Sequence, residues 1–168
     1  MRSTIRHTFN TDIDTFWNRI FFDRVFNESL FRDHLHFTRY EIVELERSDD
    51  GSVRRRVECV PPAEIPGPLK KVLGESAGYT EVGRFDPSRR RFEVEVIPNV
   101  AADKIKSRVA IWAEPRGDKQ IERVVEMDTT VKIFGVGKMA EGFIDKQARQ
   151  SYQTAADFTN RWIADKGL

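Results

Sequence analysis

The most constraining feature of this sequence is its C-terminal stretch, residues 135–168, which has the pattern of one long amphipathic helix. Apolar or small residues return every three to four positions from Val136 to Trp162, which is the period of one helix face. The opposite side carries charged residues such as Lys138 and Asp165. The apolar face must therefore be covered, and the strand-rich middle of the chain is the candidate cover.

The N-terminal part of the chain predicts one strand followed by two short helices. Residues 3–10 alternate between two kinds of side chain, which is typical of a strand. Thr11 or Asp12 can cap a first short helix, in which apolar residues from Ile13 onward follow at helical spacing. A second helical pattern covers residues 23–35.

From residue 36 onward the period changes to two, and short turns separate the alternating segments. These segments are residues 40–46, 53–60, 79–85, 91–97, 104–114 and 120–133. Because the connections are short, the pattern predicts an antiparallel meander with one buried face. One insertion, residues 61–79, contains four prolines and a short amphipathic turn. A lid over a cavity and a crossover that covers one end of the sheet both explain it.

Composition limits the class of protein. A length of 168 residues predicts a single domain, residues 1–168. The 28 basic and 27 acidic residues create no overall field that favours nucleic acid. Cys59 is the only cysteine and the N-terminus has no apolar run of the signal-peptide type, so we expect a cytoplasmic location. No stretch reaches the ~20 apolar residues that cross a bilayer, so we expect no stable insertion and at most peripheral membrane contact.

The order of these elements resembles the helix-grip architecture of the START-like superfamily, also called SRPBCC or polyketide cyclase-like. The opening TIRHTFNTDIDTFWNRIFFD is similar to the start of that superfamily, in which a strand leads to a helix with an aromatic pair, here Phe16 and Trp17, followed by Asp23. The insertion from Pro66 to Gly74 is similar to a bacterial branch without an assigned activity.

The resemblance implies an α+β fold: a curved antiparallel sheet of about seven strands, two short helices after strand 1 and a long C-terminal helix. It also implies a cavity between sheet and helix that holds a hydrophobic or amphipathic small molecule such as a lipid, for transport, storage or sensing. Two alternatives stay open, an aromatase/cyclase- or hydratase-like enzyme and a co-chaperone-like module that binds proteins. The resemblance implies no cofactor, and the sequence leaves the oligomeric state open.

Candidate ligand-binding residues are polar groups on expected core faces and side chains that join an apolar body to a polar tip. Gln147, Ser151 and Thr154 interrupt the apolar stripe of the long helix, where a ligand or pocket water can satisfy them. Bonding to the sheet or a slight rotation of the helix is the alternative. The full set expected to bind a ligand is His7, Tyr40, Leu69, Leu73, Tyr79, Trp112, Met127, Phe143, Gln147, Ser151 and Thr154.

No catalytic set and no metal-binding pattern are evident from the sequence. It contains no phosphate-binding glycine loop and no HExxH spacing. His34 and His36 are interpreted as part of a helix end, and His7 or Tyr152 is the candidate acid or base if the protein is an enzyme.

Two arginine triplets, residues 54–56 and 89–91, lie in or beside turns. They are interpreted as solvated charge, with a contact to an anionic lipid surface as the alternative.

Overall fold

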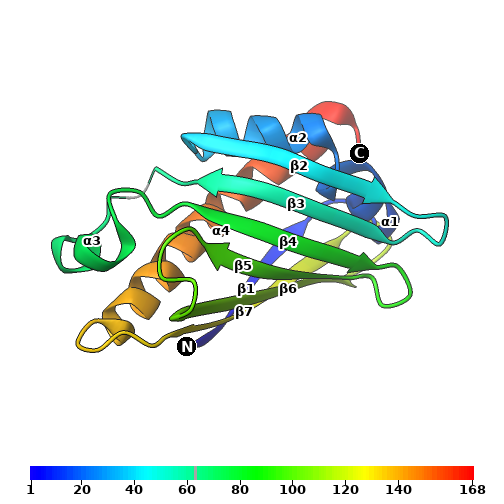
Figure 1. Ribbon diagram of the computed structural model, residues 1–168. Helices are drawn as coiled ribbons and strands as arrows, with labels where there is room; N and C mark the ends of the chain where they lie inside the picture. Colours follow the sequence, from blue (N-terminus) through cyan, green and yellow to red (C-terminus); the bar gives the residue numbers. More distant parts are fainter. Residues whose placement is uncertain (63) are drawn as a thin grey trace.

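The computed structural model describes residues 1–62 and 64–168. Seven antiparallel strands form one sheet in the order β1-β7-β6-β5-β4-β3-β2, and the long helix α4 (Gly137–Lys166) runs across one face of it (Figure 1). The predicted helix-grip architecture is confirmed. Among the described helices, none is both long and apolar enough to cross a membrane.

The first strand, β1 (Arg2–Phe9), leads into two short helical segments, each of which begins as an α-helix and continues as a π-helix. The segments are α1 (Ile13–Thr15) with η1 (Phe16–Phe21), and α2 (Arg24–Ser29) with η2 (Leu30–His34). Aspartates cap both: Asp12 accepts from the Thr15 backbone N–H at 2.8 Å, and Asp23 accepts from the Phe26 N–H at 2.7 Å. Both predicted helices are present, although their apolar spacing did not reveal the π-helical halves.

The remaining strands follow the predicted segments closely. They are β2 (Arg39–Arg47), β3 (Val53–Val60), β4 (Tyr79–Asp86), β5 (Arg91–Pro98), β6 (Ile105–Pro115) and β7 (Ile121–Val131). Consecutive strands from β2 to β7 pair as neighbours, which confirms the meander, and β1 adds to the far side of β7. A bulge between Ile42 and Glu44 interrupts the pairing of β2 with β3.

The insertion between β3 and β4 forms the short helix α3 (Gly67–Leu73), and its residue 63 lies outside the described residues. Leu69 and Leu73 pack with Ile105 and Ala140 in an apolar cluster separate from the main core. The insertion thus covers the sheet at the end where α4 begins (Figure 1). That it opens as a lid stays a prediction.

The main core lies between the inner face of the sheet, the two short helical segments and the second half of α4. Aromatic contacts hold α4 there, because Phe26 of α2 lies 5.4 Å from Phe158 and 5.5 Å from Trp162, measured between ring centroids. Phe158 and Trp162 therefore hold the second half of α4 against α2.

Gly83 of β4 makes room for one aromatic ring in this core. A Cβ atom at Gly83 would lie 2.1 Å from Cζ of Phe92, so the ring occupies the space that any other residue would need. Phe92 is 1% exposed and packs against the rings of Phe21 and Phe22, so it cannot turn away without disturbing them. The glycine therefore fixes the position of a ring that also lines the cavity described below.

We predict that Gly83→Ala lowers the free energy of unfolding by about 1–3 kcal/mol, because the methyl group overlaps the Phe92 ring. Urea denaturation followed by circular dichroism measures the change. Gly142→Ala is the matched control, since no heavy atom lies within 4 Å of its added Cβ and alanine favours a helix. Equal stability of the Gly83 variant and the wild type would contradict the packing argument.

Candidate ligand-binding cavity

A cavity of about 90 Å³ lies between the inner face of the sheet, the short helical segments and the second half of α4. Most of its wall is apolar and aromatic: Phe16, Phe21, Phe31, Phe92, Val94 and Ile111 are among the lining residues. Six side chains with polar groups also line it, namely Asn27, Arg55, Glu81, Arg123, Tyr152 and Thr159. The cavity therefore combines apolar surface with buried charge.

Arg55 of β3 and Glu81 of β4 form one polar side of the cavity. The guanidinium lies 3.8 Å from the Glu81 carboxylate and is stacked over the ring of Phe92, at 4.9 Å from the ring centroid. Arg55 is only 8% exposed. Burial raises the pKa of Glu81 above its usual value, and the nearby Arg55 partly offsets that shift.

Arg123 of β7 lies on the opposite flank of the cavity wall and is 6% exposed. Its Nη2 donates to Nδ1 of His7 at 3.0 Å and to the backbone carbonyl of Tyr152 at 3.3 Å. Its guanidinium also lies over the rings of Phe9 and Tyr152, at 4.9 and 5.1 Å. Burial lowers the pKa of Arg123 to about 10, so the side chain is still charged at neutral pH.

His7 holds Arg123 from the β1 side. Its Nε2 donates to Oε1 of Gln153 at 3.2 Å, which leaves Nδ1 as the acceptor for Arg123. This arrangement requires a neutral imidazole. Burial, and next the charge of Arg123, lower the pKa of His7. The expected site residue His7 thus reaches the cavity only through Arg123.

Two tyrosines differ in their relation to the cavity. Tyr152 of α4 lines it, and burial raises the pKa of its phenol to about 12. Tyr40 of β2 lies in a neighbouring apolar cluster, stacked on Phe31 at 4.1 Å. Its hydroxyl is buried and has no hydrogen-bond partner among the residues that the structure describes.

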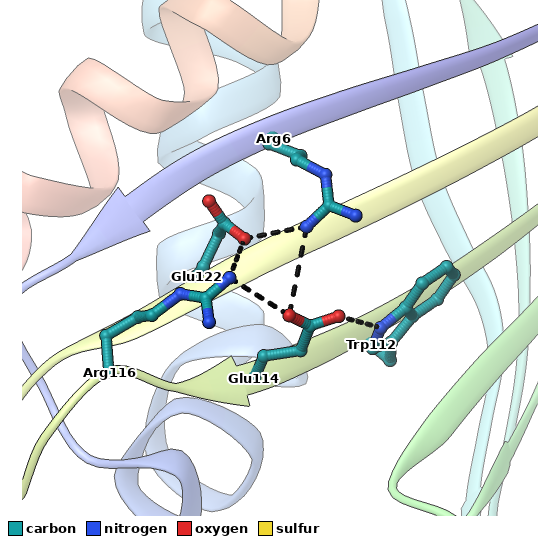
Figure 2. Close-up of polar contacts among 5 residues, drawn as sticks. All are labelled: Arg6, Trp112, Glu114, Arg116 and Glu122. Atoms are coloured by element: carbon teal, nitrogen blue, oxygen red, sulfur yellow. Dashed lines mark hydrogen bonds and ion pairs between the residues drawn. The ribbon is translucent and has the colours of Figure 1, made fainter.

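Trp112, expected to bind a ligand, lies on the outer face of the sheet instead. Its Nε1 donates to Glu114 at 3.1 Å, and Glu114 belongs to an ion-pair cluster with Arg6, Arg116 and Glu122 (Figure 2). The expectation that Trp112 faces the cavity is wrong because of the alternation along β6. The residues on either side of Trp112 are buried, so Trp112 itself lies on the outer face.

Five other expected site residues lie outside the cavity wall. Met127 lies in the main core, and Tyr79 packs beside the cluster that contains Tyr40. Leu69, Leu73 and Phe143 belong to the cluster under α3. None of these five lines the cavity of 90 Å³, and a ligand contact for them stays a prediction.

Gln147, Ser151 and Thr154 are half-buried on α4, and none of the three lines the cavity either. The cavity lies along the second half of the helix, where Ala155 and Thr159 line the wall. A ligand role for the three polar residues stays a prediction.

Sequence reasoning missed Arg55, Glu81 and Arg123 as cavity residues. The interpretation of the triplet 54–56 as solvated charge is wrong for its middle member, because Arg55 is buried while its two neighbours are exposed. A signal was present in the sequence: each of these charged residues shares its face of an alternating strand with apolar residues. Arg123, for example, lies between Ile121 and Val125 on that face.

Comparison with known proteins supports this fold. A family described as "Protein of unknown function (DUF2505)" matches residues 4–163. Among curated proteins, no sequence matches the chain.

Similar solved structures include a norcoclaurine synthase from Thalictrum flavum (19% identity, TM-score 0.69, covering 100% of this chain and 98% of that one). The Zhui aromatase/cyclase from Streptomyces sp. R1128 (14%, 0.66, 97% and 95%) and a START superfamily protein from Mycobacterium smegmatis (14%, 0.54, 98% and 97%) are also similar. At these identities the likeness shows the fold, which is that of START-like proteins.

We predict that His7 makes the protein less stable as the pH falls. Because the folded pKa lies below the unfolded value of 6.5, the unfolded chain binds the proton first as the pH drops through that value. His7→Gln removes the titration, and its amide oxygen can still accept from Arg123. The stability advantage of the wild type over the variant should therefore decrease from about pH 7.5 to about pH 5 in urea denaturation. Parallel stability curves for the two proteins would refute it.

Proposed function

We propose that this protein, which belongs to the DUF2505 family of proteins of unknown function, binds a hydrophobic or amphipathic small molecule between its sheet and α4. Carriage, storage or sensing of that molecule is the corresponding role. The observation that carries the proposal is the cavity itself, in which aromatic walls enclose charged and polar side chains. A core that serves packing alone has little reason to enclose two guanidinium groups.

The volume of the cavity limits what it can hold. At about 90 Å³ it is smaller than the engineered cavity of about 150 Å³ that binds benzene. A short chain is therefore the ligand body that this conformation favours. A body the size of an aromatic ring, or a longer lipid, requires a change in the wall, of which Phe21 and Phe31 are half-buried members.

A cytoplasmic setting is part of the proposal. Cys59 is free and buried in the cluster beside Tyr40, and burial raises the pKa of its thiol. A protonated, inaccessible thiol behaves as a small apolar residue, which suits a reducing compartment.

The second candidate function is enzymatic, and one observation favours it. Glu81 faces the cavity with a raised pKa, and a carboxyl group of this kind can act as a general acid or base. An aromatase/cyclase and a norcoclaurine synthase are among the proteins with a similar fold. If the protein is an enzyme, Glu81→Gln should abolish conversion of an identified ligand while binding persists. A carrier releases the same molecule that it bound.

Native mass spectrometry of protein purified from its own host tests the proposal directly. A co-purifying small molecule that is lost on denaturation supports it and identifies the ligand. The same experiment on the Ala155→Leu variant should show that the molecule is absent, since the larger side chain fills the cavity.

We predict that the neutral probe 2-phenylethanol binds in this cavity and that filling the cavity weakens its binding. In methyl-labelled protein, NMR signals of Ile20, Val94 and Ile111 should shift on titration, because these residues line the wall. Exposed Val82 and Ile97 should not shift. Ala155→Leu should weaken the probe at least about tenfold by occupying its space.

The control for this variant is Ala164→Leu, which makes the same change at an exposed position of the same helix. Wild-type affinity is expected for the control. Shifts at Val82 and Ile97 without shifts at the cavity methyl groups would mean that the probe binds elsewhere.

A further inference from the structure

Arg123 has a hydrogen-bond donor that the described part of the chain leaves unpaired. The side chain is 6% exposed, and its Nε is buried without a hydrogen-bond partner among the residues that the structure describes. A buried donor on a charged group costs more when unpaired than a neutral one does. Because Arg123 lines the cavity, a molecule there can accept hydrogen bonds from its guanidinium.

The charge of Arg123 is also unbalanced. Of the charged side chains that line the described cavity, Arg55 is paired with Glu81, whereas Arg123 has a neutral imidazole and a backbone carbonyl as its hydrogen-bond partners. Asp157 lies near His7, but it is exposed and accepts from Gln153 at 3.1 Å. The cavity therefore holds one positive charge that no described side chain within it neutralises.

We infer that the ligand carries a carboxylate group that binds Arg123, with its apolar body against the phenylalanine-rich wall. This inference rests on the proposed function. A guanidinium donates charge-assisted hydrogen bonds to a carboxylate. Because Nη2 of Arg123 already donates to His7 and Tyr152, Nε and Nη1 are the donors left for the ligand. The single charge of a carboxylate matches the single unneutralised charge of the cavity.

The small volume and the apolar wall of the cavity limit the size and polarity of the part of the ligand that does not bind Arg123. The rings of Phe16, Phe21 and Phe92 surround space for a short chain, and a body the size of one aromatic ring requires the half-buried Phe21 to shift. His7 fixes the orientation of the guanidinium from the side of β1, so it is a positioning residue for this acid site. An aryl or short-chain monocarboxylic acid is therefore the ligand class.

Three probes with the same phenylethyl-sized body test the inference: phenylacetate, 2-phenylethanol and 2-phenylethylamine. Dissociation constants come from the shifts of the cavity methyl groups of Ile20, Val94 and Ile111 at neutral pH. Phenylacetate should bind at least about tenfold more tightly than the alcohol, because charge-assisted hydrogen bonds are stronger than neutral ones. The amine should bind most weakly.

Substitutions then test whether Arg123 causes the preference for the carboxylate probe. Arg123→Met removes the charge with little change of volume, and the ratio of alcohol to acid dissociation constants should fall to about 1. Arg108→Met is the matched control, since Arg108 is exposed on the neighbouring strand, and its ratio should equal that of the wild type. If Arg123→Met does not fold, the affinities of the three probes for the wild type still test whether the cavity prefers a carboxylate. The carbon-13 signal of carboxyl-labelled phenylacetate is a second test on the wild type. Bound to Arg123, that carboxyl should stay ionised to lower pH than in free solution.

The outcomes separate this inference from the proposed function. If 2-phenylethanol shifts the cavity methyl groups but phenylacetate binds no more tightly, or the amine binds best, the acid site is refuted and the binding cavity stands. If none of the three probes shifts these methyl groups, both proposals fail.

Discussion

The structure depends on the contact between the apolar face of α4 and the inner face of a sheet that cannot cover it alone. The helix contacts β1 and β7, and the short helical segments after β1 fill the space between its second half and the other strands. Phe26 stacks on Phe158 to close that layer. A three-sided enclosure of this kind brings together side chains from nearly every element, and its remaining volume is the cavity.

The inner face of the sheet also carries buried charged residues, which a purely apolar core would lack. Replacing a buried ion by an apolar residue of similar size is often neutral or stabilising, so buried guanidinium groups are weak stabilisers. Arg55 recovers part of its desolvation cost from Glu81 and from three phenylalanine rings around it. Arg123 recovers less, because its described partners carry no full charge. The inner face thus carries buried charge at some expense of stability.

Much of the fold could be predicted from the sequence because it follows from periodicity. The change from period two to period 3.6 located the strands and α4, and short turns implied the meander. The candidate site was harder, since it depends on which face of each strand points inward. Trp112 was expected inside and lies outside, while Arg55 was interpreted as solvated and lies inside. Polar residues on a strand are normally assigned to the wet face, and that rule fails where a cavity requires polar groups.

The position of the cavity along α4 could not be predicted from the helix alone. Polar residues in the apolar stripe, such as Ser151, indicated its first half, but the gap between layers is set by what packs on both sides. At the first half, α3 brings Leu69 and Leu73 against the sheet and helix and closes the space. At the second half, phenylalanine rings from η1 and η2 are too large and rigid to fill every gap beside Ala155. Small residues on the helix opposite large rings on the sheet and short helices therefore determine where the cavity lies.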